Sequence, residues 1–234
     1  ILDRGTLEGR FDYIIAHGLY SWVPPAVAER VLEICREHLA PNGIAYVSYN
    51  VYPGWHFRGV LRGMMMYHAA GFADPKLRIQ QGKALVDFLA ARSPQGFFAD
   101  TLKAGADLMR DGEDNYLYHE YLETENHPAY FHEFAERAHA KGLAYLGGTQ
   151  LPGVATKTLP ADTVQALQRA AGGDALRVEQ YTDFLTNRSF RESLLVHREQ
   201  SFQRTPDWKP VRHLWITHWL TPGDPAFDPA SGNA

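Results

Sequence analysis

Short apolar runs and one amphipathic stretch alternate over the first fifty residues. Residues 11–18 (FDYIIAHG) form a β-rich apolar run that is typical of a strand buried on both faces. Residues 25–40 repeat apolar positions at helical spacing, and residues 44–50 (IAYVSYN) predict a second strand. The helix is expected to pack on the strands through Val27, Val31 and Ile34. Strand, helix and strand make a βαβ unit, whose two strands are parallel.

From residue 55 to about residue 115 the pattern turns helical. Asp74-Pro75 and Ser93-Pro94 divide three stretches with apolar positions at helical spacing. We expect three helices that form a cap inserted after the second strand, with apolar faces packed partly on one another and partly over the strand ends. The positions expected on those faces include Leu61, Met65, Leu85, Phe88, Leu89 and Leu102.

Helix and strand alternate again in the last third of the chain. Residues 128–142 predict a helix, and LAYLGG at 143–148 predicts a strand. Residues 161–173 predict another helix outside the sheet. The segment 178–199 begins as a helix and ends in RESLLVHR, where alternation indicates a strand. The chain is therefore expected to be α/β.

Length and charge narrow the classes of partner. The 234 residues suit one large domain or one and a fraction. Lysine and arginine number 23 against 27 aspartate and glutamate, and neither sign gathers into a block. The charge therefore offers no argument for nucleic acid or for anionic lipid. No run approaches the ~18 apolar residues of a membrane span, so a membrane partner is not expected.

The single cysteine, Cys35, excludes an internal disulfide and an all-cysteine metal site. It fits a reducing compartment, so a cytoplasmic location is expected. Its place in a helical pattern suggests a small core residue rather than a nucleophile. The chain starts at Ile1 rather than at an initiator methionine, and we expect it to be part of a longer protein.

Chemistry-bearing residues follow both predicted strands. In an open parallel sheet, ligands bind beyond the carboxyl ends of the strands. The residues that the two strands deliver to that edge include His17, Gly18, Tyr20, Trp22, Tyr49, Asn50 and Trp55. Electron-rich rings beside a histidine and an asparagine suit a small, cationic ligand. Alternatively, Trp22 and Trp55 are large anchors that cover the sheet edge, and both interpretations stay open.

Eleven histidines raise the question of a metal, which their spacing does not support. His132 and His139 are seven residues apart and lack the i, i+4 spacing of a zincin helix. His119 and Glu120 are adjacent and project differently from a regular element. No metal site is expected. The sequence also lacks a Gly-x-Ser-x-Gly elbow, a P-loop and a Gly-x-Gly-x-x-Gly turn, so it holds no complete catalytic signature.

Two motifs resemble a known bacterial family. FDYIIAHGLYSWVPP (11–25) and HLAPNGIAYVSYNVYPGW (38–55) are similar to the fourth and fifth strands, with their turns, of class I S-adenosylmethionine-dependent methyltransferases that carry a methyltransferase regulatory domain. Residues 116–148 resemble the regulatory segment of that family, and residues 180–199 resemble its ending. The likeness covers about residues 8–200.

The resemblance implies a partial Rossmann-like methyltransferase sheet with a helical cap insertion and an additional α+β regulatory segment. Residues 1–57 would be the C-terminal part of the catalytic fold, and residues 58–200 the regulatory domain. Within that domain, 58–115 is the expected cap and 116–200 the expected α/β segment, while 201–234 is a linker or the start of a further domain. The Gly-rich first turn and the acidic residue for the ribose would lie upstream in the same polypeptide.

The implied cofactor is S-adenosylmethionine, with His17 and Gly18 among its binding residues. The resemblance suggests catalytic roles for Tyr20, Trp22 and Glu120, and a substrate channel of Tyr49, Asn50 and Trp55. Some relatives methylate protein lysines, although nothing in these residues selects that acceptor. A lysine acceptor must lose a proton from an amine of pKa ~10.4, which a desolvated, aromatic channel favours. Glu120 or His17 would take that proton.

Two functions of different classes remain. In the first, the chain completes the substrate side of a methyltransferase active site and modulates methyl transfer. In the second, it is a non-catalytic module for dimerisation or interaction, with no cofactor binding of its own. The isolated chain is expected to be inactive in either case, and a homodimer stays open.

Overall fold

The computed structural model describes residues 8–149, 159–202 and 209. The chain divides into two compact units, Ile1–Arg204 and Thr205–Ala234, and nearly all described residues belong to the first. The expected linker at 201–234 falls almost wholly outside the described residues.

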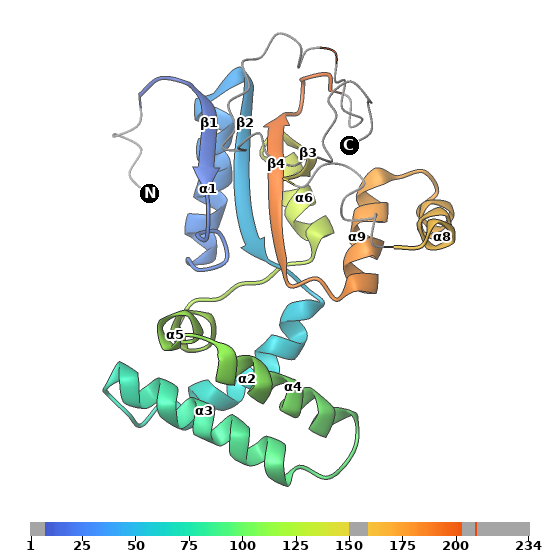
Figure 1. Ribbon diagram of the computed structural model, residues 1–234. Coiled ribbons are helices and arrows are strands. Elements are labelled where there is room, and N and C mark those ends of the chain that lie inside the picture. Colours follow the sequence, from blue (N-terminus) through green and yellow to red (C-terminus); the bar gives the residue numbers. More distant parts are fainter. Residues whose placement is uncertain (1–7, 150–158, 203–208, 210–234) are drawn as a thin grey trace, which may run out of the picture. The chain divides into compact units, whose positions relative to one another are not determined.

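Four strands form one sheet in the order β1-β2-β4-β3 (Figure 1). The strands are β1 (Phe11–Ala16), β2 (Leu39–Asn50), β3 (Leu143–Gly148) and β4 (Phe190–His197). β1 and β2 are parallel neighbours joined by α1 (Pro25–His38), which confirms the βαβ prediction. β4 is antiparallel to both β2 and β3.

α1 packs on the sheet with a stripe that differs from the predicted one. Its buried apolar residues are Ala28, Val31, Leu32 and Cys35, while Val27 and Ile34 are only half-buried. The two stripes share Val31 and differ by a small rotation about the helix axis. Cys35, which is fully buried, therefore lies on the face of α1 that packs against the sheet. Burial raises the pKa of its thiol to about 12, as the prediction of a core residue requires.

The two faces of the sheet are covered differently. α1 and α6 (Phe131–Ala140) pack on one face, where Phe134 stacks on Tyr49 with ring centroids 4.0 Å apart. On β1, Tyr13 and Ile15 are each 73% exposed. The prediction that β1 is buried on both faces is therefore wrong for the described residues. The run is apolar on both sides, but the described helices cover only one of them.

Four helices follow β2: α2 (Gly54–Ala69), α3 (Pro75–Arg92), α4 (Phe97–Asp111) and α5 (Asp114–Leu122). They share an apolar core of their own, in which Leu61, Met65 and Leu102 are buried as predicted. Three helices were expected over this region, and α5 was not among them.

The inward face of α3 runs through Ile79, Gly82 and Val86. Phe88 lies two residues beyond Val86, about 200° further round the helix, and is 59% exposed, so its predicted burial is wrong. Leu85 and Leu89 are half-buried. α3 packs closely on α2 at Gly82, where a Cβ would lie 2.8 Å from Cε, the flexible end of the Met65 side chain.

The last third of the chain follows its predictions. The helices are α6, α8 (Ala161–Ala171) and α9 (Ala175–Thr186), and the strands are β3 and β4. Both strands belong to the segment 116–200, yet they extend the sheet that β1 and β2 begin. The sheet is therefore continuous across residue 57, where the resemblance puts a domain boundary.

Candidate functional site

A cavity of about 400 Å³ lies at the edge of the sheet where β1 and β2 end. Its walls come from those strand ends, from the start of β4 and from α2 and α5. The lining residues are His17, Gly18, Trp22, Asn50, Trp55, Arg58, Tyr116, His119, Glu120, Ser189 and Phe190.

Parallel pairing places the wall residues that follow β1 and β2 side by side, because these two strands end at the same edge of the sheet. Gly18 turns the chain after β1 with a φ of 62°, and its backbone N–H donates to Ser48 Oγ at 2.8 Å. The Asn50 backbone N–H donates to Ser21 Oγ at 2.9 Å. The Asn50 side chain donates to Asn126 Oδ1 at 3.0 Å. The end of β2 is thereby tied to the turn after β1 and to the loop after α5.

α2 begins close to the segment that enters β4. The backbone N–H of Gly54 donates to the carbonyl of Arg188 at 2.9 Å. A Cβ at this position would lie 2.6 Å from that same oxygen, so only glycine fits here. The contact sets where α2 starts and so directs Trp55 and Arg58 toward the cavity.

An aromatic cluster joins the strand ends to α2 and α5. The Trp22 ring lies 4.3 Å from the His119 ring and 6.0 Å, edge to face, from the Trp55 ring. The Arg58 guanidinium lies 5.7 Å from the Trp55 ring centroid. Trp55 is 2% exposed and is therefore also a packing anchor, whereas Trp22 is half-buried at the cavity wall.

Glu120 is the buried carboxylate of this cavity. Arg58 Nη1 donates to its Oε2 at 2.9 Å, and the residue is 9% exposed. Burial raises the pKa of the Glu120 carboxyl, and the charge of Arg58 opposes that rise. Glu120 and its neighbour His119 project differently, as the sequence suggested: one pairs with Arg58, and the other stacks on Trp22.

Six of the eight predicted site residues line this cavity: His17, Gly18, Trp22, Asn50, Trp55 and Glu120. Tyr20 and Tyr49 do not line it, because both are buried in the core between the sheet and α6. Tyr49 precedes Asn50 in β2, so its side chain points to the opposite face of the sheet. There it shares a 3.0 Å hydrogen bond with Ser193 Oγ. The chemical roles of all eight residues stay predictions.

Sequence reasoning missed five of the wall residues: Arg58, Tyr116, His119, Ser189 and Phe190. Arg58 follows Trp55 by three residues on α2, and Tyr116 precedes Glu120 by four residues on α5, so helical spacing held a signal for both. His119 is adjacent to Glu120. Ser189 and Phe190 reach the cavity through contacts between residues that are distant in the sequence, which no local pattern indicates.

In the described part of the chain, no three histidine, cysteine, aspartate or glutamate side chains gather in a way that could hold a metal ion. Over the same residues, none of the helices combines the length and the apolar character needed to cross a membrane.

Part of the chain matches a family of known proteins. Residues 113–197 match the family model described as a predicted methyltransferase regulatory domain. This stretch includes α5, with His119 and Glu120, and both β3 and β4. The expected resemblance to methyltransferases with a regulatory domain is confirmed at this level.

Particular relatives extend the likeness over the rest of the chain. The Rickettsia prowazekii protein RP789 is 37% identical over the whole chain, which spans 42% of that protein. A second protein of the same organism, RP028, is 41% identical over 62% of this chain and 59% of its own length. Among solved structures, PKMT2 from Rickettsia typhi in complex with AdoHcy is 38% identical, with a TM-score of 0.75. That match covers 88% of this chain and 39% of PKMT2. The chain thus spans less than two thirds of each of these relatives.

Proposed function

We propose that this chain forms the acceptor side of an S-adenosylmethionine-dependent methyltransferase and that its regulatory segment modulates methyl transfer. The observation that carries the proposal is the composition of the cavity wall. One half comes from the ends of parallel strands, and the other half includes α5, which belongs to the matched regulatory segment. A segment built into the site wall affects the reaction directly.

The remainder of the same polypeptide would supply the first half of the catalytic fold. The exposed Tyr13 and Ile15 on β1 support this, because monomeric proteins rarely leave a contiguous apolar face uncovered. Ile44, Tyr46 and Leu194 of the neighbouring strands adjoin them. The relatives supply the second argument, since RP789 and PKMT2 are each more than twice the length that this chain spans.

The residues at the end of β1 fit the expected cofactor. S-adenosylmethionine supplies a methyl group on a sulfonium, and AdoHcy is what remains of it after transfer. Among the described residues, a Cβ on Gly18 would meet nothing within 4 Å, so this turn leaves room for the approach of a ligand. His17 and Gly18 would contribute contacts there, while the Gly-rich turn would come from the upstream segment.

The cavity suits an acceptor amine such as that of a lysine. The rings of Trp22 and Tyr116 present electron-rich surface to a cation. Burial beside these rings favours the neutral amine, which is the nucleophile. Glu120, with its pKa raised by burial, is the base that would accept the proton. The name PKMT2, which denotes a protein lysine methyltransferase, supports this acceptor class.

Calorimetry on two proteins tests the split site. We expect the 234-residue chain to bind no S-adenosylmethionine up to roughly millimolar ligand. Each backbone hydrogen bond lost with the Gly-rich turn costs ~1 kcal/mol, and ~1.4 kcal/mol weakens binding tenfold. The protein extended upstream to the length of its relatives should bind at micromolar concentration. A saturable micromolar isotherm from the chain alone would overturn the split.

Trp22→Ala in the extended protein tests the acceptor side. We expect ~10- to 100-fold slower methyl transfer to a lysine peptide, with cofactor affinity changed less. The reason is that Trp22 lines the 400 Å³ cavity at the ends of β1 and β2, in which the acceptor would bind. Tyr67→Ala is the matched control, since Tyr67 is 87% exposed on α2 and outside the cavity wall. Equal loss of cofactor affinity and rate would assign Trp22 to the cofactor instead.

A further inference from the structure

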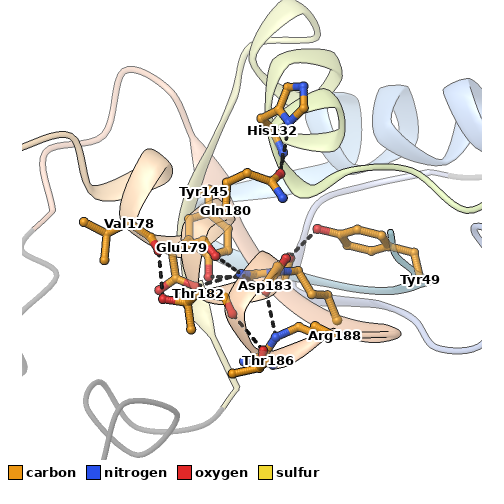
Figure 2. A network of polar contacts seen from close by, with 12 residues as sticks. Tyr49, His132, Tyr145, Val178, Glu179, Gln180, Thr182, Asp183, Thr186 and Arg188 are labelled. Atoms are coloured by element: carbon orange, nitrogen blue, oxygen red, sulfur yellow. Dashed lines mark hydrogen bonds and ion pairs between the residues drawn. The ribbon is translucent and has the colours of Figure 1, made fainter. Parts of the chain in front are cut away.

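A row of polar side chains crosses the face of the sheet that the described helices leave open. Figure 2 shows the opposite, helix-covered side, where Tyr49 lies in the core and its register partner Arg191 binds Asp183. Side chains alternate between the two faces along a strand. Ser48, which precedes Tyr49, and Glu192, which follows Arg191, therefore point to the open face, and these two residues also pair in register.

Hydrogen bonds join this row from the end of β3 to the end of β1. Tyr46 lies two residues before Ser48 on the same face, and its Oη donates to Glu192 Oε1 at 2.6 Å. His17 Nδ1 lies 2.8 Å from Tyr46 Oη and 3.3 Å from Ser48 Oγ. The other carboxylate oxygen, Glu192 Oε2, accepts from Thr149 Oγ1 at 2.7 Å. The row ends at His17, which lines the 400 Å³ cavity at the strand ends.

The direction of these bonds decides which nitrogen of His17 carries a proton. A phenol has one hydrogen, and Tyr46 donates it to the Glu192 carboxylate. Burial, with the neighbouring Glu192, raises the pKa of Tyr46 to about 12, and the bond from Tyr46 lowers the pKa of Glu192, so the proton stays on the phenol. The Tyr46 oxygen can then only accept from His17, and the 2.8 Å contact is a bond from Nδ1–H. In the neutral ring this leaves the lone pair on Nε2.

From these bonds we infer that Tyr46 and Glu192 are positioning residues, which hold His17 in the Nδ1–H form and leave Nε2 as a hydrogen-bond acceptor for a ligand. The His17 side chain is exposed, and Nε2 makes no hydrogen bond with the part of the chain that the structure describes. The ligand group that it meets must therefore be a donor, which means a hydroxyl or an amine. S-adenosylmethionine carries both groups, and an acceptor lysine carries the second. This ligand role rests on the proposed methyltransferase function, whereas the hydrogen bonds of the row do not.

The row also connects the regulatory segment to the site. Thr149 and Glu192 lie within residues 113–197, which match the regulatory-domain model, whereas His17 and Tyr46 precede that match. One phenol separates the Glu192 carboxylate from the His17 ring. The regulatory segment would therefore influence ligand binding through the tautomer of His17.

The nitrogen chemical shifts of the His17 ring test this inference by NMR on the 234-residue chain, at a pH at which the ring is neutral. We expect the proton on Nδ1. Glu192→Ala frees the Tyr46 hydroxyl to donate to Nδ1 and should move the His17 proton to Nε2. Glu192→Gln still offers an oxygen to Tyr46 and should keep the proton on Nδ1. Tyr67→Phe, at a position of α2 that is 87% exposed, is the control and should change nothing.

Two results of this measurement would overturn the inference. One is a proton on Nε2 in the unchanged chain, and the other is a proton that stays on Nδ1 in Glu192→Ala. If Glu192→Ala unfolds the chain, Tyr46→Phe replaces it. Removal of the Tyr46 oxygen takes away the acceptor for Nδ1–H, so the proton should no longer be confined to Nδ1.

His17→Asn in the extended protein tests the ligand role. Asparagine can keep a donor near the position of Nδ1 but loses the acceptor at Nε2. A roughly tenfold loss of AdoHcy affinity in calorimetry would assign the donor to the cofactor, and a roughly tenfold higher KM for a lysine peptide would assign it to the acceptor. His139→Asn, an exposed position of α6 outside the cavity wall, should change neither value. If His17→Asn also changes neither, Nε2 meets no ligand. An extended protein that binds no AdoHcy would refute the proposed function, while the nitrogen shifts still decide whether the row fixes His17.

Discussion

Two buried carboxylates of this chain, Glu120 and Asp183, are paired with arginine in different ways. Burial raises the pKa of both carboxyls, and arginine opposes the rise in both. Asp183 is fully buried and receives Arg191 Nε at 2.6 Å and Arg191 Nη2 at 2.8 Å. Arg188 Nε lies 2.8 Å from the same carboxylate. Glu120 is 9% exposed and receives a single bond from Arg58.

We expect this difference to separate a structural ion pair, that of Asp183, from a reactive one, that of Glu120. Both oxygens of the Asp183 carboxylate accept from Arg191, and Arg188 Nε adds a second positive charge 2.8 Å away. Arg191 also places its guanidinium 4.0 Å from the Phe131 ring centroid. The Glu120 carboxylate faces a cavity, and only its Oε2 takes a hydrogen bond within the described residues. Its Oε1 therefore remains available to a ligand. We expect the first pair to control stability and the second to control chemistry.

The largest effect should come from Arg191→Ala, which leaves the Asp183 charge buried with one of its two arginines. We expect the free energy of unfolding to fall by ~3–5 kcal/mol, the usual cost of breaking a buried pair. Urea unfolding of the chain measures it. Arg110→Ala is the control, because Arg110 pairs with Asp107 at 2.8 Å while 63% exposed, and such pairs contribute at most ~1 kcal/mol. A loss below ~1 kcal/mol for Arg191→Ala would remove the structural half of the comparison.

The second effect is on the reaction. Glu120→Gln in the extended protein should slow methyl transfer ~10²-fold or more, the usual contribution of a general base. The free energy of unfolding should change much less than in Arg191→Ala. Glu123→Gln, an exposed position just after α5, is the matched control and should leave the rate unchanged. Full activity of Glu120→Gln would rule out Glu120 as the base.

The pH profile of the same variant sharpens this result. The base acts in its charged form, so the rate should rise with pH as Glu120 loses its proton, at a pH above the usual glutamate range because burial raises its pKa. The free energy of unfolding should depend on pH in the opposite direction and fall as the pH rises. A raised carboxyl pKa stabilises the fold at low pH, and this contribution is lost as pH rises through the folded-state pKa. Glu120→Gln should flatten both dependences.

Local patterns predicted the elements of the fold and the parallel pairing of β1 with β2, and they missed the antiparallel pairings of β4. The βαβ unit and the last helices and strands follow from apolar runs that each occupy one segment. The position of β4 between β2 and β3 does not follow from such runs. Antiparallel pairing joins residues that are distant in the sequence, such as Ala45 and Leu195. The α3 face was misread at Phe88 because several overlapping stripes fit the same amphipathic sequence.

The candidate site was predicted from one rule and completed by contacts that the rule does not contain. The rule that ligands bind at the carboxyl ends of parallel strands predicted His17, Trp22 and Asn50, which line the cavity. The rule does not say to which face of the sheet a side chain points, and the Tyr49 side chain points into the core rather than into the cavity. Glu120 came from the family resemblance, while its partner Arg58, 62 residues earlier in the chain, was missed.

A third carboxylate tests whether burial, rather than arginine, decides the direction of these pKa shifts. Glu192 on β4 is only half-buried and accepts from Tyr46 Oη at 2.6 Å and Thr149 Oγ1 at 2.7 Å. These two bonds, led by that of Tyr46, lower the pKa of Glu192 below its usual 4.5. Burial and the neighbouring Glu192 raise the pKa of Tyr46 to about 12, so the phenol keeps the proton that it donates.

Tyr46→Phe should therefore have the smallest effect, a loss of ~1 kcal/mol of unfolding free energy at about pH 7. A depressed carboxyl pKa stabilises the fold above the unfolded value, and this contribution is lost as pH falls through the folded value. The difference between Tyr46→Phe and the unchanged chain should thus shrink in urea unfolding as the pH falls below 4.5, the usual pKa of Glu192. Tyr13→Phe on the exposed face of β1 is the control and should change stability little at either pH. An equal loss at both pH values would mean that Tyr46 acts through packing, and that its hydrogen bond to Glu192 does not stabilise the fold.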